Sequence, residues 1–452
     1  MRLSVIGCGY LGAVHAACMA SIGHEVIGVD IDPARISTLA AGHAPFYEPG
    51  LTELLSSVAG SGRLRFTTDI TRAGGAAVHF LCVGTPQQEG ELRADLSHLH
   101  AATSSLLPLL QPGDIVVGKS TVPVGTAEAL AGLVSARGAT LVWNPEFLRE
   151  GCAVEDTLHP DRIVYGLPTE QGVPTEAGIK AQALLDQVYA VSLSDGAAQV
   201  ITDYATAQLV KVAANSFLAT KISFINAMAE LCEASGGDVT DLADAIGYDE
   251  RIGRRFLSAG LGFGGGCLPK DIRAFTARAG ELGVSDALSF LTEVDKINQR
   301  RRARMVDLTR EVCGGSIVGK TIAVLGVTFK PDTDDIRDSP ALSVARQMMQ
   351  EGAHVTVTDP RGLDKARRVH PDLRCADDVL EAGRGADVVV LGTEWEQYRT
   401  IEPDALAQVV RHRRMLDGRN ALDAGVWRNA GWTYRALGRP HWNPTIAGLD
   451  LS

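Results

Sequence analysis

Cysteine is sparse in this sequence, and no two cysteines have the spacing of a zinc or redox motif. The 452 residues contain 8 cysteines and no Cys-x-x-Cys pair. This usage is typical of the reducing cytoplasm, where a lone cysteine is either core filler or a nucleophile. No metal site is predicted, because His98 and His100 have no third candidate ligand nearby. We therefore expect a cytoplasmic protein without a bound metal.

Basic residues are not in excess either. Lysine and arginine number 43 against 54 aspartates and glutamates, and the formal net charge is −11. That sign argues against a protein dedicated to nucleic acid or to anionic membranes, although it leaves room for local basic sites that bind a phosphorylated ligand. With 45% hydrophobic and 21% charged residues, the composition is that of a folded globular chain of about three domains.

A long uninterrupted apolar run is also missing. The stretch Leu3–Ala20 follows Arg2 and ends in a lipobox-like sequence, and it is the one feature that suggests export or a membrane segment. Glycines at positions 7, 9 and 12 interrupt the helix that such a segment needs, and the stretch continues directly into a second apolar run. We expect no membrane association.

The N-terminus contains instead a glycine-rich strand-helix-strand unit. The β-branched run 2–7 precedes the motif Gly7-x-Gly9-x-x-Gly12, and a helical stretch leads to a second strand, 24–29, that ends at Asp30. The glycines serve a tight turn, close approach of a pyrophosphate, and helix-on-strand packing. Asp30 would accept hydrogen bonds from a ribose 2′-hydroxyl and repel a 2′-phosphate, which predicts NAD rather than NADP. The alternative is a strand-turn-helix without a ligand.

Three further short strands are predicted over Ala77–Val83, Asp114–Lys119 and Thr140–Trp143. Loop residues follow each of them at its carboxyl end, where open α/β sheets bind their ligands. Residues 1–195 are therefore predicted to form a doubly wound dinucleotide-binding domain.

A different pattern begins after residue 195. The segment Asp203–Ser235 contains no glycine or proline over 33 residues and carries apolar residues at helical spacing. A helix of this length measures about 50 Å, and we expect it to span two domains or to form a seam between subunits. Further helix is predicted to residue 310, interrupted by the glycine-rich loop Leu261–Asp271. Residues 196–312 are predicted as a central helical dimerisation domain.

A second strand-helix-strand unit begins at Lys320–Gly326. The dipeptide Ser339-Pro340 supplies the expected N-cap and first residue of its helix, and the next strand is His354–Thr358. The G-x-G-x-x-G motif is missing here, so we expect residues 313–452 to form a Rossmann-like domain that binds something other than a dinucleotide. The predicted fold class is α/β, with two Rossmann-like doubly wound domains joined by a long central helix and a helical dimerisation region.

Seven segments of the chain, in order, match motifs of one family. They are Gly7–Gly12, Phe46–Leu51, Ser120–Gly125, Asn144–Gly151, Lys211–Ala219, Gly262–Asp271 and Phe329-Lys330. On these motifs the chain resembles the UDP-glucose/GDP-mannose dehydrogenase family over nearly its whole length. The resemblance implies an oxidoreductase that uses two NAD molecules to oxidise the C6 alcohol of a nucleotide sugar to a carboxylate, without releasing the aldehyde. It also implies a homodimer or higher homo-oligomer formed through the central helix.

The substrate implied by the resemblance is UDP-glucose, and the product is UDP-glucuronate. The segment Asn215–Ala219 and the loop around Cys267 are most similar to that branch, while GDP-mannose and UDP-N-acetylhexosamines are the alternatives within the family. A catalytically silent nucleotide-sugar-binding protein is an alternative of another class. The complete set of Cys267, Lys211, Asn215 and Asp271 argues against it.

The chemistry of the reaction agrees with the residues around Cys267. Oxidation of an alcohol to an acid removes two hydrides, and a thiol that adds to the aldehyde supplies the tetrahedral carbon from which the second hydride leaves. Cys267 follows a glycine run and lies just before Pro269, the predicted first residue of a helix whose amides and dipole would lower the thiol pKa. The alternative for any one cysteine is buried filler.

Further catalytic residues follow partly from spacing and partly from the resemblance. Lys211 and Asn215 lie four residues apart, hence on one helix face, and can direct an ammonium and an amide at the same oxygen; a solvated helix face is the alternative. The resemblance implies that this pair stabilises the oxyanion. It also implies that Asp271 assists through water, that Glu146 serves thioester hydrolysis, and that Thr121 holds a catalytic water. The base for the first oxidation stays open.

Ligand contacts are implied by the resemblance alone. For NAD they are Gly7, Gly9, Tyr10, Leu11, Gly12, Asp30, Arg35, Thr85, Ser120, Glu150 and Arg337. For the UDP-sugar they are Glu146, Phe147, Leu148, Lys211, Asn215, Phe263, Gly264, Lys330 and Arg419, together with Arg251, which would reach the substrate of the neighbouring subunit. The loop departs from the common family pattern Gly-Gly-Ser-Cys-Phe at two positions, Gly266 and Leu268. Both flank the proposed nucleophile, so they affect the shape of its pocket.

Overall fold

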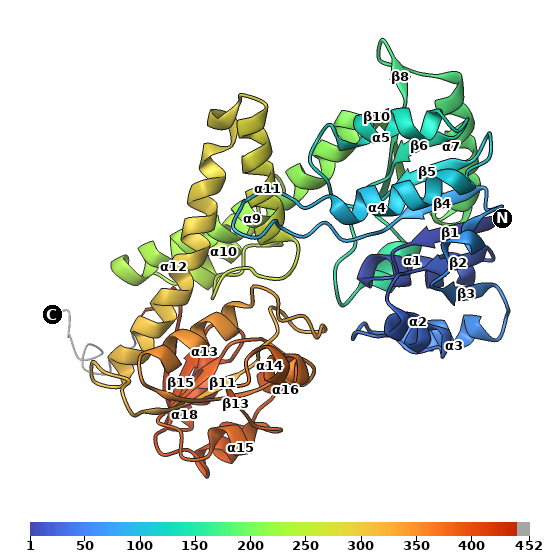
Figure 1. Ribbon diagram of the computed structural model, residues 1–452. Helices are drawn as coiled ribbons and strands as arrows, with labels where there is room; N and C mark the ends of the chain where they lie inside the picture. The colour runs from blue at the N-terminus through green and yellow to red at the C-terminus, as the bar shows by residue number, and fades with distance from the viewer. Residues whose placement is uncertain (441–452) are drawn as a thin grey trace. The chain divides into compact units, whose positions relative to one another are not determined.

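The computed structural model describes residues 1–440. The chain divides into two compact units, one made of Met1–Asn215 with Arg273–Ala287 and the other of Ser216–Ile272 with the chain from Leu288 onward. Two α-helices, α9 (Tyr204–Ser235) and α11 (Leu268–Glu281), contribute residues to both units (Figure 1), as does the short 3-10 helix η3 (Ser285–Leu288).

The first unit is built on an eight-stranded sheet in the order β10-β7-β6-β5-β4-β1-β2-β3. Its strands are β1 (Arg2–Ile6), β2 (Glu25–Val29), β3 (Leu64–Thr67), β4 (Val78–Leu81), β5 (Ile115–Gly118), β6 (Thr140–Trp143), β7 (Arg162–Leu167) and β10 (Ala198–Asp203). Neighbouring strands are parallel except β6 and β7. The carboxyl ends of β1, β2, β4, β5 and β6 therefore meet at one edge of the sheet, as the sequence predicted.

Helices cover both faces of this sheet. They are α1 (Tyr10–Ser21), α2 (Pro33–Ala40), α3 (Leu51–Ala59), α4 (Ser97–Leu106), α5 (Thr126–Ser135), α6 (Ala153–Leu158), α7 (Glu176–Val188) and α8 (Ala190–Ser194), with the short 3-10 helices η1 (Ile70–Ala73) and η2 (Leu107–Leu109) and a small hairpin, β8 (Thr169–Glu170) and β9 (Val173–Pro174). Successive residues of a strand point to opposite faces. Val117 of β5 accordingly lies in a core with α1, α3 and α7, whereas Val116 lies in a second core with α4 and α5. This is the predicted doubly wound arrangement.

The second unit contains a parallel six-stranded sheet in the order β13-β12-β11-β14-β15-β16. Its strands are β11 (Thr321–Leu325), β12 (His354–Thr358), β13 (Arg374–Cys375), β14 (Val388–Leu391), β15 (Arg414–Asp417) and β16 (Thr433–Ala436). Its helices are α10 (Val239–Gly247), α12 (Ser289–Val312), α13 (Pro340–Gln350), α14 (Leu363–Val369), α15 (Val379–Gly383), α16 (Glu396–Arg399), α17 (Pro403–Ala407) and α18 (Ala424–Asn429), and η3 (Ser285–Leu288) precedes α12. Ser339 caps α13 by accepting from the Leu342 amide, and Pro340 is its first residue, as predicted.

The long helix α9 runs without interruption from Tyr204 to Ser235, in agreement with the missing glycines and prolines. Within the second unit it packs against α12 through buried polar contacts. The fully buried Arg301 lies 3.1 Å from a carboxylate oxygen of Glu233, and Arg304 lies 2.6 Å from the other. The Ser223 hydroxyl donates to the Val294 carbonyl at 2.7 Å. Over the described part of the chain, no helix combines the length and apolar character needed to cross a bilayer.

One predicted boundary is corrected. Helix α11 begins at Leu268, so Pro269 is its second residue rather than its first. Proline is tolerated at either position, because the first four amides of a helix have no partner inside it and a missing N–H costs nothing there. Cys267 directly precedes the helix, and the Asp271 amide donates to the Cys267 carbonyl at 2.9 Å. Cys267 and Asp271 therefore stand one turn apart, at the helix N-terminus.

Candidate functional site

The glycine motif after β1 leaves space for a ligand at one position and is filled at the other two. Gly7 has φ +90°, and a Cβ there would lie 2.8 Å from a Val83 methyl; a Cβ on Gly12 would lie 1.8 Å from the Gly7 carbonyl oxygen. A Cβ on Gly9 would have no atom within 4 Å. The loop and α1 are thus packed as tightly as glycine allows, and the backbone at Gly9 stays open to a pyrophosphate.

Asp30 lies at the end of β2 and is held by the same loop. Its carboxylate accepts from the Cys8 amide at 2.7 Å and the Asp32 amide at 3.0 Å. The Arg35 guanidinium lies 2.9 Å and 3.0 Å from its two oxygens. The acid is therefore oriented beside the glycine loop, in the place where a dinucleotide-binding fold hydrogen-bonds a ribose.

Glu48, a residue of the Phe46–Leu51 motif to which no role was assigned, joins α1 to the loop after β6. Its carboxylate accepts from the amides of Gly151 and Ala153, both at 2.7 Å, and from the Tyr10 hydroxyl. Burial, together with the Glu48 charge, raises the pKa of Tyr10. No local sequence pattern marks this link, which fixes the loop that contains Glu150.

Hydroxyl groups fix the loops after β4 and β5. The Thr85 hydroxyl donates to the Thr121 carbonyl at 2.7 Å, and the Ser120 hydroxyl donates to the Val83 carbonyl at 2.6 Å. Each bond crosses from one strand end to the next. The two loops therefore form one connected surface at the carboxyl edge of the sheet.

Glu146 and Lys211 form a shielded ion pair in the first unit. The Lys211 Nζ lies 2.8 Å from Glu146 Oε1, and Glu146 Oε2 accepts from the Leu148 amide at 2.8 Å. Phe147 lies between two cations: its ring centre is 5.7 Å from the Lys211 Nζ and 3.9 Å from the Arg162 guanidinium. Lys211 and Asn215, one turn apart on α9, are 5% and 8% exposed. They do not form a solvated helix face.

The loop before Cys267 is shaped by close contacts that only glycine permits. A Cβ on Gly262 would lie 2.2 Å from Asn298 Oδ1, and one on Gly264 would lie 2.3 Å from the Asp338 carbonyl oxygen. The Asn298 side chain also accepts from the Phe263 amide at 2.7 Å and donates to its carbonyl at 2.9 Å. The loop is therefore anchored to α12 and to the segment before α13.

The departure at Gly266 has a structural reason. A Cβ on Gly266 would lie 2.3 Å from the Arg337 guanidinium carbon, because the Arg337 side chain occupies the space that a larger residue would need. The Asp335 carboxylate holds the guanidinium at 2.8 Å and 2.9 Å from its Nε. The thiol of the next residue, Cys267, is exposed. Cys267 is therefore not buried filler.

Arg419 connects the Cys267 loop to the second sheet. Its guanidinium donates to the carbonyls of Gly392 at 2.7 Å, Phe329 at 3.0 Å and Gly262 at 3.2 Å. The buried Asp417 accepts from the Arg419 amide at 2.8 Å and so orients the turn; burial raises the pKa of this carboxyl.

The remaining predicted residues of the second unit lie in different surroundings. Asp271 is 2% exposed and lies 2.5 Å from the Lys270 ammonium. Lys330 places its Nζ 5.6 Å from the Phe329 ring centre. Arg251 follows α10 with its side chain 89% exposed, paired with Asp249 at 2.6 Å. Arg251 therefore points to solvent within this chain.

The predicted site residues fall into two groups. The first unit holds Gly7, Gly9, Tyr10, Leu11, Gly12, Asp30, Arg35, Thr85, Ser120, Thr121, Glu146, Phe147, Leu148, Glu150, Lys211 and Asn215. The second unit holds Arg251, Phe263, Gly264, Cys267, Asp271, Lys330, Arg337 and Arg419. Arg337 is thus the one predicted NAD contact outside the first unit. Residues 1–440 contain no cluster of three or more His, Cys, Asp or Glu side chains that could hold a metal.

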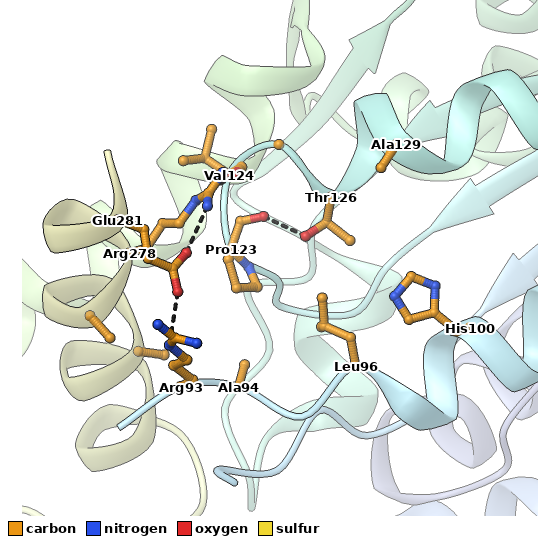
Figure 2. Close-up of a pocket in the computed structure, with 13 residues that line it drawn as sticks. Arg93, Ala94, Leu96, His100, Pro123, Val124, Thr126, Ala129, Arg278 and Glu281 are labelled. Carbon is orange, nitrogen blue, oxygen red and sulfur yellow. Dashed lines mark hydrogen bonds and ion pairs between the residues drawn. The ribbon is translucent and has the colours of Figure 1, made fainter. Parts of the chain in front are cut away.

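A pocket of about 260 Å³ lies beside the Ser120–Gly125 loop in the first unit, and none of the predicted site residues lines it. Arg278 of α11 donates to the Val124 carbonyl at 2.8 Å and pairs with Glu281 at 2.7 Å, and Glu281 also pairs with Arg93 at 3.0 Å (Figure 2). These contacts fasten the C-terminal half of α11 to the loop that carries Thr121.

A glycine loop with space for a phosphate, followed by an acid at the end of the next strand, is typical of a nicotinamide-dinucleotide-dependent dehydrogenase. Three models of the UDP-glucose/GDP-mannose dehydrogenase family match the chain: the NAD binding domain over residues 1–190, the central domain over 205–300 and the UDP binding domain over 323–424. The chain belongs to this family and is an NAD-dependent oxidoreductase.

Individual relatives agree over the full length. The chain is 42% identical to the UDP-glucose 6-dehydrogenase of Rhizobium meliloti (strain 1021), over 97% of this chain and 100% of that protein. It is 38% identical to the UDP-glucose 6-dehydrogenase TuaD of Bacillus subtilis (strain 168), over 97% and 93%. The structure of a UDP-glucose dehydrogenase from Pyrobaculum islandicum superposes with a TM-score of 0.86 at 36% identity, over 97% of this chain and 98% of that one.

Proposed function

We propose that this enzyme oxidises the C6 alcohol of UDP-glucose to the carboxylate of UDP-glucuronate. The observation that carries the proposal is the end-to-end similarity, at 42% identity, to a protein named UDP-glucose 6-dehydrogenase. NAD, held by the Gly7–Gly12 loop and Asp30, would supply the hydride acceptor for both oxidation steps. Per sugar, the reaction consumes two NAD and one water and releases two NADH and three protons.

Cys267 is proposed as the nucleophile. Its sulfur adds to the carbon of the aldehyde formed by the first oxidation, and the resulting thiohemiacetal keeps that carbon bound to the chain. Loss of the second hydride gives a thioester, whose C–S bond is then broken by water, releasing the acid and the thiol. The exposed position of Cys267 at the start of α11 supports this role, since helix amides and dipole favour the thiolate.

The ion pair of Glu146 and Lys211 is proposed to serve the charged intermediates. An ammonium and an amide one turn apart, on Lys211 and Asn215, provide two donors for an oxyanion. Glu146, already 2.8 Å from that ammonium, is positioned to take a proton from the hydrolytic water, which we propose is held by Thr121. Asp271 is proposed to assist through water. The cationic side chains of Lys330 and Arg419 are proposed to bind the anionic UDP-sugar.

An assay with a panel of nucleotide sugars tests the function. With limiting UDP-glucose and excess NAD, we expect about two NADH per sugar, because two hydrides leave the same carbon. One NADH per sugar with free aldehyde would contradict the covalent mechanism. Faster turnover of GDP-mannose or a UDP-N-acetylhexosamine would mean that this sugar, and not UDP-glucose, is the substrate. Binding of a nucleotide sugar without production of NADH would indicate a catalytically silent binding protein.

We also propose a homodimer or higher homo-oligomer formed through α9. In the second unit this helix exposes Phe217, Phe224 and Leu231, which are 67%, 49% and 59% exposed. Their spacing of seven residues places them on one face, and an apolar face of this length is stabilised by a partner. The solvent-directed Arg251 is available to reach the substrate of a neighbouring subunit.

Mixed dimers test the shared site. Arg251→Ala alone is expected to raise the KM for UDP-glucose, and Cys267→Ser alone to abolish turnover. In a heterodimer of these two variants, one site has an intact Cys267 and receives an intact Arg251, so activity is expected to recover. A fully active monomer in sedimentation, or no recovery after verified subunit exchange, would contradict the proposal.

The division into domains 1–195, 196–312 and 313–452 is proposed as well. It is supported by the three family models, which match 1–190, 205–300 and 323–424. A cytoplasmic location is proposed because the eight cysteines, all within the described residues, form no disulfide, as expected in a reducing compartment. Fractionation of the native cells, with detection in the soluble cytoplasmic fraction, tests the location.

A further inference from the structure

Lys119 is a buried cation beneath the loop that carries Thr121. It is 7% exposed. Its Nζ donates to Asn144 Oδ1 at 2.9 Å and to the Tyr189 hydroxyl at 3.3 Å, and that hydroxyl donates to the same Asn144 oxygen at 2.7 Å. Both partners are neutral. Keeping an ammonium away from water on neutral partners costs free energy, so its presence calls for an explanation.

The hydrogen bond from Lys119 to Asn144 joins two neighbouring strand ends. Lys119 directly follows β5 and Asn144 directly follows β6, and the Asn144 amide donates on to the Val164 carbonyl of β7 at 2.9 Å. The chain continues from Lys119 to Thr121 and from Asn144 to Glu146. One side-chain contact therefore connects the bases of the two loops that carry these proposed catalytic residues.

Charged and titratable groups face Lys119 from several elements. They are His15 of α1, Cys82 after β4, Glu146 after β6, Tyr189 after α7 and Lys211 of α9. Burial, with a smaller contribution from the Lys211 charge, lowers the pKa of Lys119 to about 8, and Cys82 and Glu146 act in the opposite direction. The side chain is thus mostly an ammonium at neutral pH. Two ammoniums then accompany one carboxylate, which leaves net positive charge at the edge where an oxyanion is to be stabilised.

We propose that Lys119 is a positioning residue for the oxidation. Through Asn144 it holds the Thr121 loop and the Glu146 loop in fixed register, and its charge supports the Lys211 ammonium in stabilising negative charge. This inference rests on the proposed roles of Glu146 and Thr121. In this proposal the buried Lys119 acts through its neighbours and not by direct contact with substrate or NAD.

Replacement of Lys119 by methionine tests the proposal, because it keeps the length of the side chain and removes the charge and the donors. We expect kcat to fall about 10- to 100-fold, as when catalytic groups are displaced slightly. The KM values for NAD and UDP-glucose should change less than about threefold, since the proposal gives Lys119 no part in binding either ligand. Lys119→Arg, which restores the charge and a donor, should recover part of the loss.

Tyr189→Phe is the matched control. It removes a hydroxyl from the same buried network but leaves the Lys119 to Asn144 bond in place. We expect a lower Tm, comparable with that of Lys119→Met, and a kcat within about threefold of the unmodified enzyme. An equal loss of kcat in both variants would show that only the stability of the network matters, and would overturn the proposal.

A double-mutant cycle with Glu146→Gln separates this proposal from the proposed function. If Lys119 acts through Glu146, adding Lys119→Met to Glu146→Gln should cost less than about threefold in kcat. The role of Lys119 would be overturned if Lys119→Met lowered kcat by the same factor in the unmodified enzyme and in Glu146→Gln. It would also be overturned if Lys119→Met left the kcat of the unmodified enzyme unchanged. Full turnover of Glu146→Gln would instead contradict the role of Glu146. If Lys119→Met does not fold, Lys119→Gln, which keeps a donor without the charge, carries the same cycle.

Discussion

Each of the two Rossmann-like sheets has an acid directly after its second strand, Asp30 in the first and Asp359 in the second. The two acids differ in their hydrogen-bond partners. In the first, Asp30 accepts from two backbone amides and pairs with Arg35. In the second, Asp359 follows β12 in the same way. Its carboxylate accepts from the amides of Val327 and Gly362, both at 2.7 Å, and from the Trp395 indole at 3.2 Å. The Asp359 carboxylate therefore serves to hold the loops of its own domain together.

The glycine loops differ in the same sense. Helix α1 begins at Tyr10, directly after the open position Gly9, so its first amides can face a phosphate. Helix α13 begins only at Pro340, after the loop 327–339. The glycines directly after the first strands are alike: a Cβ on Gly326 would lie 2.4 Å from Thr393, and one on Gly7 would lie 2.8 Å from Val83. The comparison teaches that a strand-end acid and a crowded first glycine do not make a dinucleotide site unless an open glycine and a helix N-terminus follow directly.

The largest expected effect concerns the thiol of the second unit. Cys267→Ser should lower turnover by about 1,000-fold or more, since serine is a weak nucleophile at neutral pH without its own base. Binding of NAD and UDP-glucose, measured by calorimetry, should stay close to that of the unmodified enzyme. Cys152→Ser, at the other exposed cysteine, is the control and should keep full activity. The assignment of Cys267 as the nucleophile is wrong if Cys267→Ser keeps full activity and Cys152→Ser loses it.

Next in size is the effect of filling the first glycine loop. Gly12→Ala places a Cβ against the Gly7 carbonyl, so the loop must shift, and we expect kcat/KM for NAD to fall about 10- to 100-fold. Gly326→Ala in the second loop is also crowded, with the added Cβ 2.4 Å from Thr393, and Gly326 has φ +104°. It should lower the Tm while leaving the KM for NAD unchanged. Weakened NAD binding in Gly326→Ala would break the comparison between the two sheets.

Features that are local in the chain could be predicted from the sequence, whereas contacts between distant residues could not. The strand-glycine-helix-acid pattern predicted the first two strands, the helix between them and the position of Asp30 at the end of β2, because those features are local in the chain. The absence of helix breakers likewise predicted α9. The roles of Glu48 and Lys119 depend on contacts with residues distant in sequence, Gly151 and Asn144. No local pattern marks such contacts, so the structure was needed to find them.

A smaller effect is expected on the preference for NAD over NADP, and it distinguishes the role of Asp30 from that of Asp359. Asp30→Ala should narrow the preference for NAD over NADP about 10-fold, because a carboxylate no longer occupies the place of the 2′-phosphate. Asp359→Ala should leave that preference unchanged but destabilise the protein by about 2–4 kcal/mol, since several buried donors lose their acceptor. Ratios of kcat/KM and denaturant unfolding measure the two effects. Equal kcat/KM for both cofactors in the unmodified enzyme would refute the role of Asp30.

The smallest expected effect is on the acid stability of the two sheets. In residues 1–440 the buried histidines, His15 and His79, both belong to the first unit. Burial lowers the pKa of each, and in His15 the neighbouring Lys119 charge adds to this effect. Below pH about 6.5 the unfolded chain therefore binds protons that the folded chain does not. The free energy of unfolding should fall with decreasing pH, by up to about 1.4 kcal/mol per pH unit for each histidine.

Hydrogen exchange at pH 7.5 and 5.5, corrected for intrinsic rates, can locate this effect. We expect strands β1, β4 and β5 to lose protection at the lower pH, while β11, β12 and β14 keep theirs. His15→Leu should reduce the pH dependence in the first sheet, because a side chain that cannot bind a proton replaces one that is held neutral only by the fold. Equal loss of protection in both sheets, or an unchanged pH dependence in His15→Leu, would show that other groups govern acid unfolding.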